Sequence, residues 1–166
     1  MERTKEIEAR VVSTLEYLKI AYETFEIDPN FADTAAFCEK YGFSMRESGN
    51  TILVASKRGN KKYSACIVRA TDRLDVNHTV KRLMEVSRAS FASADETTEL
   101  TGMMIGGVTQ FALPENVPIY VDLRILELDS VILGSGSRSS KLKMAPSELR
   151  KTPNIHFIEG IGISAS

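Results

Sequence analysis

The side chains most often used in catalysis are scarce in this sequence. Its 166 residues contain two cysteines, Cys38 and Cys66, and two histidines, His78 and His156. They form no C-x-x-C or H-E-x-x-H spacing, so the sequence predicts neither a structural zinc site nor a metal-dependent hydrolase. Both cysteines lie at apolar-periodic positions, which favours a place in the core. We therefore expect any chemistry here to use neither a Cys/His pair nor a metal.

Glycine is the residue type with the most uneven distribution. Five of the ten glycines fall between positions 102 and 136. Gly102 and Gly107 have the spacing of a P-loop, but Val108 stands where that motif needs a lysine, so we reject triphosphate binding. The pair Gly106-Gly107 could instead direct two adjacent backbone N–H groups at a carbonyl oxygen and stabilise an oxyanion. A tight turn between a helix and a strand is an equally good interpretation.

A second glycine segment, GSGSRSS, covers residues 134–140 and follows a predicted strand. It has only the first half of a dinucleotide-binding fingerprint, and it leads into another strand rather than a helix. It also lacks the G-x-S-x-G of a hydrolase nucleophile elbow. Its serines and its arginine fit either a polar pocket that binds phosphate or a flexible hairpin turn.

The net charge of −1 conceals an uneven distribution of charge along the chain. Residues 57–88 carry nine basic and three acidic side chains, whereas residues 89–136 carry one basic and seven acidic ones. A basic block of this kind can form a surface that meets phosphates. Solvated lysines on a hairpin and a helix are the alternative interpretation.

Length and composition predict one globular domain over residues 1–166, because 43% of the residues are hydrophobic and 26% are charged. No apolar run approaches the roughly 18 residues of a membrane span. The first ten residues, MERTKEIEAR, lack the apolar centre of a signal peptide. We therefore expect a cytoplasmic protein that does not associate with membranes.

Hydrophobic periodicity predicts a mixture of helices and strands. Apolar residues at spacings of three and four predict a helix over residues 3–20. Two β-rich runs, 51–56 and 62–70, flank a loop that contains Gly59 and predict a hairpin. Further short elements are expected: strands near 22–27, 89–92, 119–123, 130–134 and 141–144, and helices that begin at Asp33, Asp75, Asp95 and Pro146. Because regular βαβ alternation is absent, we expect an α+β fold.

Six segments, in their order along the chain, resemble the YbaK/ProX family of aminoacyl-tRNA deacylases, also called the YbaK/prolyl-tRNA synthetase-associated domain. The resemblance runs from about Val11 to Leu149. The segments are DTAAFCEKYG (33–42), NTILVA (50–55), RLDVNHTVKRL (73–83), ADETTELTGMMIGGVTQFAL (94–113), PIYVDLRIL (118–126) and GSGSR (134–138). The T-G-x-x-x-G-G-V block, followed by a V-D strand and a glycine turn, is the most specific part.

This resemblance implies an α+β fold with a single mixed, mostly antiparallel, barrel-like sheet and flanking helices. It also implies a trans-editing enzyme that hydrolyses the ester between a wrong amino acid and tRNA, with no cofactor and no metal. The implied partners are the aminoacylated acceptor end of tRNA and, for some members, an aminoacyl-tRNA synthetase. The basic block at 57–88 is then a candidate surface for the acceptor stem.

The resemblance also implies a set of site residues. Gly106 and Gly107 are expected to bind the aminoacyl carbonyl through backbone groups, with Asn50 near the ribose–phosphate. A hydroxyl of the substrate's terminal ribose is expected to assist the attack by water. Further substrate-binding positions are Tyr22, Thr101, Gly102, Ser135 and Gly136.

One position departs from the family pattern. The family commonly has a lysine where this chain has Asn50, and asparagine carries no charge. Lys57 lies about 20 Å further along the strand and is a poor substitute. Two alternatives therefore stay open: a catalytically weakened relative that binds tRNA or a synthetase without hydrolysis, and a small-molecule esterase. The sequence specifies neither the amino acid removed nor the oligomeric state.

Overall fold

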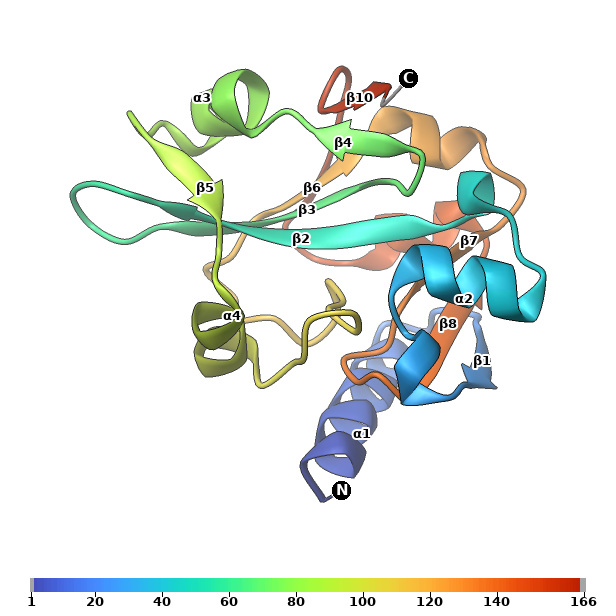
Figure 1. Ribbon diagram of the computed structural model, residues 1–166. Helices are drawn as coiled ribbons and strands as arrows, with labels where there is room; N and C mark the ends of the chain where they lie inside the picture. The colour runs from blue at the N-terminus through green and yellow to red at the C-terminus, as the bar shows by residue number, and fades with distance from the viewer. Residues whose placement is uncertain (1, 165–166) are drawn as a thin grey trace.

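The computed structural model describes residues 2–164, which form short strands and helices arranged around a long central hairpin (Figure 1). The strands are β1 (Glu23–Glu26), β2 (Gly49–Ser56), β3 (Tyr63–Arg69), β4 (Asp72–Leu74), β5 (Ala89–Phe91), β6 (Ile119–Asp122), β7 (Val131–Gly134), β8 (Ser140–Met144), β9 (Ile155–Ile158) and β10 (Gly162–Ser164). The α-helices are α1 (Glu2–Tyr17), α2 (Thr34–Tyr41), α3 (Lys81–Met84) and α4 (Ala94–Thr101). The single-turn segments are η1 (Pro29–Phe31), η2 (Met45–Glu47), η3 (Val76–Val80), η4 (Leu123–Glu127) and η5 (Pro146–Lys151).

The strands of the described residues form three sheets. The largest has the order β5-β2-β3-β6-β9, the second has the order β1-β8-β7, and β4 pairs with β10. Only the pairs β3–β6 and β6–β9 are parallel. This confirms the expected α+β fold with mostly antiparallel pairing. The expected single barrel-like sheet is corrected: one isolated bridge, between Ser48 and Ile132, joins the two larger sheets, so the hydrogen-bonded ladder does not close.

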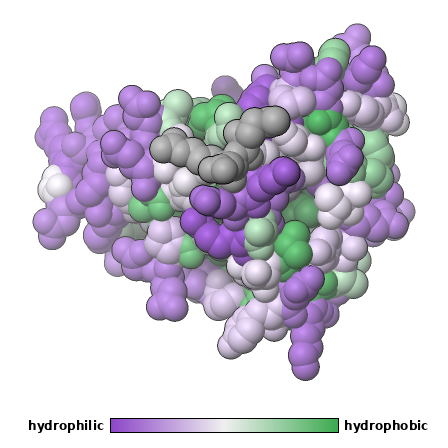
Figure 2. All heavy atoms as spheres, turned by 90° about the horizontal axis from the view of Figure 1, so that it is seen from below, coloured by the Kyte–Doolittle hydropathy of each residue, from purple (hydrophilic) through white to green (hydrophobic). Residues whose placement is uncertain are grey.

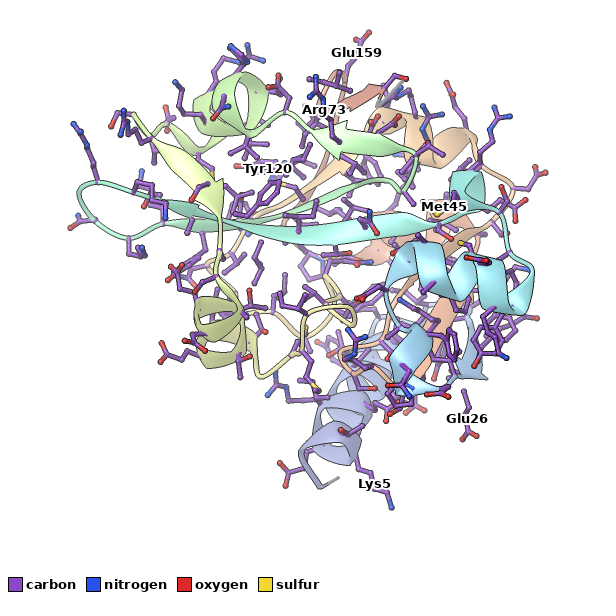
Figure 3. The ribbon with its side chains drawn as sticks, in the orientation of Figure 1. Lys5, Glu26, Met45, Arg73, Tyr120 and Glu159 are labelled. Carbon is purple, nitrogen blue, oxygen red and sulfur yellow. The ribbon has the colours of Figure 1, made fainter. Side chains whose placement is uncertain are left out.

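Two hydrophobic cores lie on opposite sides of the five-stranded sheet, because side chains alternate along its strands. The larger core lies on the side of α1 and includes Val11, Leu15, Leu53, Ile67 and Leu133. The smaller core lies under α3 and includes Val54, Cys66, Val80, Met84 and Tyr120. Tyr120 lies between the sheet and α3, and its hydroxyl donates a hydrogen bond to the Leu83 carbonyl at 3.4 Å (Figure 3). Burial of this apolar surface on both sides stabilises the central hairpin.

Most predicted elements are present, but several helix ends differ from expectation. Gly42 ends α2 with a φ of +76°, as its position predicts. The side chain of Asp33 occupies the N-cap position of the same helix without making a capping bond. The N-cap of α4 is Ser93 rather than Asp95, because Ser93 and Glu96 form a reciprocal capping box. Pro146 begins a 3-10 helix.

Figure 2 shows the molecule from the side of α1, and the hairpin end at the left of this view is almost entirely hydrophilic. Green apolar side chains lie in small areas between purple ones over the rest of this face. Within residues 2–164, no helix combines the length and the apolar character needed to cross a membrane.

Candidate functional site

A cavity of about 480 Å³ lies between the first half of β2, the start of α2 and the loop that carries Gly106. Segments that are distant in the sequence meet in its wall, which includes Asp33, Thr34, Asn50, Thr51, Gly106 and Lys141. Two further cavities beside α1, of about 550 and 740 Å³, contain neither Asn50 nor Gly106. We take the 480 Å³ cavity as the candidate site because polar groups from separate segments converge there.

The cavity exists because β2 is longer than its neighbour on one side. β5 pairs only with Val54–Ser56, so the edge of β2 at residues 50–52 has no paired strand within the described part of the chain. Met45 of η2, labelled in Figure 3, lines the cavity at the end where β2 begins. Phe91 and Ala92 line it on the side of β5. A pocket therefore opens along an edge that another strand would otherwise cover.

Asn50 lines the cavity, and its orientation is fixed from α2. The Thr34 hydroxyl donates a hydrogen bond to Asn50 Oδ1 at 2.6 Å. The Asn50 side-chain N–H₂ group makes no hydrogen bond to any residue between 2 and 164. Because the amide has two N–H donors, this group can bind an oxygen of a ligand without giving up the contact to Thr34.

The two adjacent glycines have different environments. Gly106 lines the cavity with a φ of +91°, and its N–H has no hydrogen-bond acceptor within residues 2–164. The N–H of Gly107 donates to the Met104 carbonyl at 2.9 Å. A Cβ atom on Gly107 would lie 2.0 Å from the Ser137 carbonyl oxygen, so glycine here allows two backbones to pack closely. The expected pair of adjacent donors is thus reduced to one, at Gly106.

The five further residues expected to bind substrate do not line this cavity. Tyr22 packs against the larger core. The Thr101 hydroxyl donates to the Thr97 carbonyl at 2.6 Å, and Gly102 ends α4 with a φ of +75°. Their polar groups and backbone conformations therefore serve the end of α4.

Ser135 and Gly136, in the second glycine segment, also serve the local structure of their loop. Ser135 Oγ donates to the Ser140 carbonyl at 3.0 Å, inside the loop between β7 and β8. Gly136 has a φ of +99°, and a Cβ atom there would lie 3.0 Å from the Ile7 side chain. These groups hold the loop closed against α1, so the segment is a structured turn.

Arg138 connects this turn to the rim of the cavity. Its Nη1 donates to Asp33 Oδ1 at 3.0 Å and to the Ile105 carbonyl at 2.8 Å. Its Nη2 donates to the Pro29 carbonyl at 3.0 Å. Three segments are thereby fixed by one guanidinium group. Asp33, the carboxylate in the cavity wall, is paired with this arginine.

Lys141 is the residue of the site that sequence analysis missed. Its side chain comes from β8, only 5% of the residue is exposed, and Nζ donates to the Gly106 carbonyl at 3.1 Å. Burial lowers the pKa of this ammonium to about 8; Asp33 opposes the effect and Arg138 adds to it. The alternating segment KLKM predicts a solvent-facing position for a lysine, so only its closeness to the GSGSR turn hinted at a site.

The cysteines and histidines lie outside the cavity wall. Cys38 and Cys66 are buried, which agrees with core positions, and burial raises the pKa of the Cys66 thiol to about 12. His78 is exposed beside Asp75, with Nδ1 at 3.1 Å from Oδ1, and His156 contacts Asn154. Within the described residues, no Cys, His or Ser lines the cavity. The cavity wall instead offers fixed hydrogen-bond donors, which can stabilise a negatively charged oxygen.

Comparison with known proteins identifies the family of the chain. The chain matches the aminoacyl-tRNA editing domain family over residues 28–152. It is 28% identical over 124 residues to the uncharacterized protein YwhH of Bacillus subtilis (strain 168), covering 75% of this chain and 76% of that protein.

Two solved structures have a similar fold. The hypothetical protein APE2540 has a TM-score of 0.77 and 26% identity, covering 88% of this chain and 95% of the other. A proposed trans-editing enzyme for prolyl tRNA synthetase has a TM-score of 0.78 and 21% identity, covering 92% of this chain and 95% of the other.

Proposed function

Because the chain belongs to the aminoacyl-tRNA editing domain family, we propose that it is a trans-editing deacylase that hydrolyses the ester of mischarged tRNA. The observation that carries this proposal is the cavity in which Asn50 of β2 and the unpaired N–H of Gly106 converge. These groups come from NTILVA and TGMMIGGV, two of the segments that resemble the family.

For this reaction the protein has to position the ester and supply hydrogen-bond donors to its carbonyl oxygen. The oxygen of a water molecule bonds to the ester carbonyl carbon, and the carbonyl π electrons move onto the carbonyl oxygen. When this intermediate collapses, the bond to the ribose oxygen breaks, and the ribose oxygen takes a proton released by the water. The N–H of Gly106 donates to the carbonyl oxygen while it carries the negative charge. A hydroxyl of the terminal ribose assists the attack, so no side-chain nucleophile is required.

The cavity wall divides into a polar part and an apolar part. Asn50, with its unpaired amide N–H₂ group, is placed to hold a ribose or phosphate oxygen. Ile52, Leu53 and Val108 supply apolar surface to the same cavity. We propose that the amino-acid side chain enters along this apolar part and is selected by size, within the volume of about 480 Å³.

The body of the tRNA is proposed to lie over the basic block at residues 57–88. Phe91 of the cavity wall lies on β5, and the N–H of Lys57 donates to the Arg88 carbonyl directly before that strand. Basic side chains therefore begin where the cavity wall ends. A tRNA acceptor end in the cavity would bring its phosphates to this side of the molecule, which favours salt-sensitive binding. An aminoacyl-tRNA synthetase is a further possible partner within this proposal.

A panel of mischarged tRNAs tests the proposed function. Purified protein is incubated with each tRNA, and the release of the labelled amino acid is measured against buffer alone. We expect at least one substrate to be hydrolysed well above the background rate. The Asn50→Ala variant should lose about tenfold in kcat/KM, the effect of one hydrogen bond, whereas Asn116→Ala, at an exposed position outside both the cavity wall and the basic block, should not change it. Failure to hydrolyse any member of a full panel would contradict the proposal.

A further inference from the structure

Lys141 is a buried cation with too few partners for a structural role. The residue is 5% exposed, and its one hydrogen bond within residues 2–164 is the 3.1 Å contact from Nζ to the Gly106 carbonyl. An ammonium group has three N–H donors, so two remain unused. No carboxylate of the described residues lies within 4 Å of Nζ, since Asp33 is paired with Arg138. Burial of a charge without such partners lowers the stability of the fold. A lysine retained at this cost is therefore a candidate for a functional role.

We propose that Lys141 is a catalytic residue of this site, whose ammonium group binds the carbonyl oxygen of the ester and stabilises its negative charge during hydrolysis. The proposal rests on the proposed function and adds the group that supplies positive charge. It places the second donor of the oxyanion site on β8 rather than on the neighbouring glycine.

The geometry around Gly106 supports this assignment. Lys141 Nζ donates to the carbonyl of Gly106, a residue that lines the cavity and whose own N–H is unpaired within residues 2–164. A carbonyl oxygen bound to the Gly106 N–H therefore lies close to the ammonium group. The N–H of Gly107 cannot take this place, because the Met104 carbonyl already accepts it.

The surroundings of Lys141 keep its charge available. The Phe37 ring lies beneath Nζ, with its centroid at 5.5 Å, and its face attracts the positive charge. The charged or titratable groups that act on it are Asp33 at the N-cap of α2, Cys38 of α2 and Arg138 of the β7–β8 loop. Burial lowers the pKa to about 8, so the group remains mostly protonated at pH 7. In the reaction Lys141 transfers no proton; it donates hydrogen bonds, and the water supplies the proton for the ribose oxygen.

Replacing the lysine by a residue of similar length tests the proposal. Lys141→Met keeps the apolar stem and removes the charge, and Lys143→Met on the same strand, outside the cavity wall, is the matched control. We expect kcat for deacylation to fall roughly 100-fold in Lys141→Met, the loss typical of one oxyanion donor, and to stay within twofold in Lys143→Met. Activity of a folded Lys141→Met protein within threefold of the wild type would overturn the proposal.

A second pair of variants moves the charge across the cavity. Asn50 and Lys141 line the same cavity from two different sheets. Asn50→Lys alone places two cations there, and we expect weaker activity. Asn50→Lys in the Lys141→Met background returns one cation to the site, and we expect at least tenfold recovery over Lys141→Met. No recovery in a folded double variant, together with full activity of Asn50→Lys alone, would overturn the proposal.

Binding of a stable oxyanion mimic separates this inference from the proposed function. The probe is an adenosine phosphonate ester in which the tetrahedral phosphorus replaces the ester carbon, and calorimetry measures its dissociation constant. We expect the wild type to bind it at least tenfold more tightly than Lys141→Met. This difference without deacylation of any tRNA would uphold oxyanion binding by Lys141 and contradict the proposed function. Equal binding by both proteins, or none by either, would overturn the role of Lys141.

Discussion

Two clusters of buried charge in this protein differ in how completely they are satisfied. At one end of the five-stranded sheet, Arg124 donates to the carboxylate of Asp122 and to that of Asp72. It also donates to the Gly162 carbonyl at 2.9 Å. Asp72 also accepts from Arg69 at 2.9 Å. In the cavity, by contrast, Lys141 has one carbonyl partner and no carboxylate within 4 Å among the described residues.

This difference separates structural charge from functional charge. The Arg124 cluster joins β4, β6 and β10 because its guanidinium group is paired with two buried carboxylates and a carbonyl, which is how buried ions are accommodated in a stable fold. The Lys141 ammonium and the N–H of Gly106 instead keep open donors beside a cavity. Donors without a protein partner that converge on a pocket indicate a site that a ligand completes.

The largest expected effect on stability comes from the Arg124 cluster. Arg124→Met leaves Asp122 and Asp72, whose side chains are 1% and 2% exposed, without their shared cation. We expect the free energy of unfolding to fall by about 3–5 kcal/mol. Urea denaturation measures this, with Arg73→Met on the exposed side of β4 as the control, which should stay within about 0.5 kcal/mol of the wild type. A small loss of stability in Arg124→Met would show that the Arg124 cluster does not stabilise the fold.

The second largest expected effect concerns the close backbone packing at Gly107, beside Gly106. In Gly107→Ala the new Cβ atom meets the Ser137 carbonyl oxygen at 2.0 Å, so the two glycine segments must move apart. We expect a loss of about 2–3 kcal/mol in the free energy of unfolding. Gly59→Ala has nothing within 4 Å but also a positive φ of +73°, and should lose only about 1 kcal/mol. Equal losses in denaturant titrations would show that the close packing is unimportant.

Removing the charge of Lys141 in the cavity should raise the free energy of unfolding rather than lower it. In Lys141→Met the cost of burying a charge disappears, and the bond to the Gly106 carbonyl is lost. We expect the free energy of unfolding at pH 7 to rise by about 2 kcal/mol, because a pKa lowered from 10.5 to about 8 outweighs one hydrogen bond.

The pH dependence of stability follows from the same pKa. Because the unfolded lysine binds its proton more tightly than the folded one, wild-type stability should rise with pH between about 8 and 10.5, and the variant should lack this rise. Thermal unfolding at pH 7 and pH 10 measures both effects. Destabilisation of Lys141→Met at pH 7 would assign the lysine a structural role.

The smallest expected effect concerns the orientation of Asn50. Thr34→Ala removes the hydroxyl that donates to Asn50 Oδ1 at 2.6 Å. We expect a loss of about 1 kcal/mol in stability and a few-fold increase in KM, since the amide is no longer fixed. Thr34→Ser keeps the hydroxyl and should behave as the wild type. A KM that is unchanged in Thr34→Ala would mean that Asn50 needs no support from α2.

Local patterns were enough to predict most elements of this fold. The spacing of Val11 and Leu15 predicted the first helix, and the glycine at position 42 predicted the end of α2. Division into three sheets was not predictable, since it depends on which strand edges meet in space. The capping of α4 by Ser93 was missed because Asp95 is an equally good capping residue by type.

The site was predictable only in part, for a similar reason. Asn50 and Gly106 lie in segments with recognisable motifs, and the structure brings both to one cavity. Lys141 lies in no motif, and strand alternation places it on the same face as Lys143. Its burial results from the packing of α2 over β8, where Phe37 lies beneath its ammonium group. Only tertiary structure separates these two lysines.

The most direct test of the role of Lys141 is chemical rescue of deacylation. Lys141→Ala removes the ammonium group and leaves space for a small amine beside Gly106. The measurement is the rate of amino-acid release from the preferred mischarged tRNA as methylammonium is added. We expect a rate that rises with amine concentration and saturates, while the rate of the wild type is unaffected. A folded Lys141→Ala protein that retains full activity without amine, or that no concentration of amine restores, would contradict it.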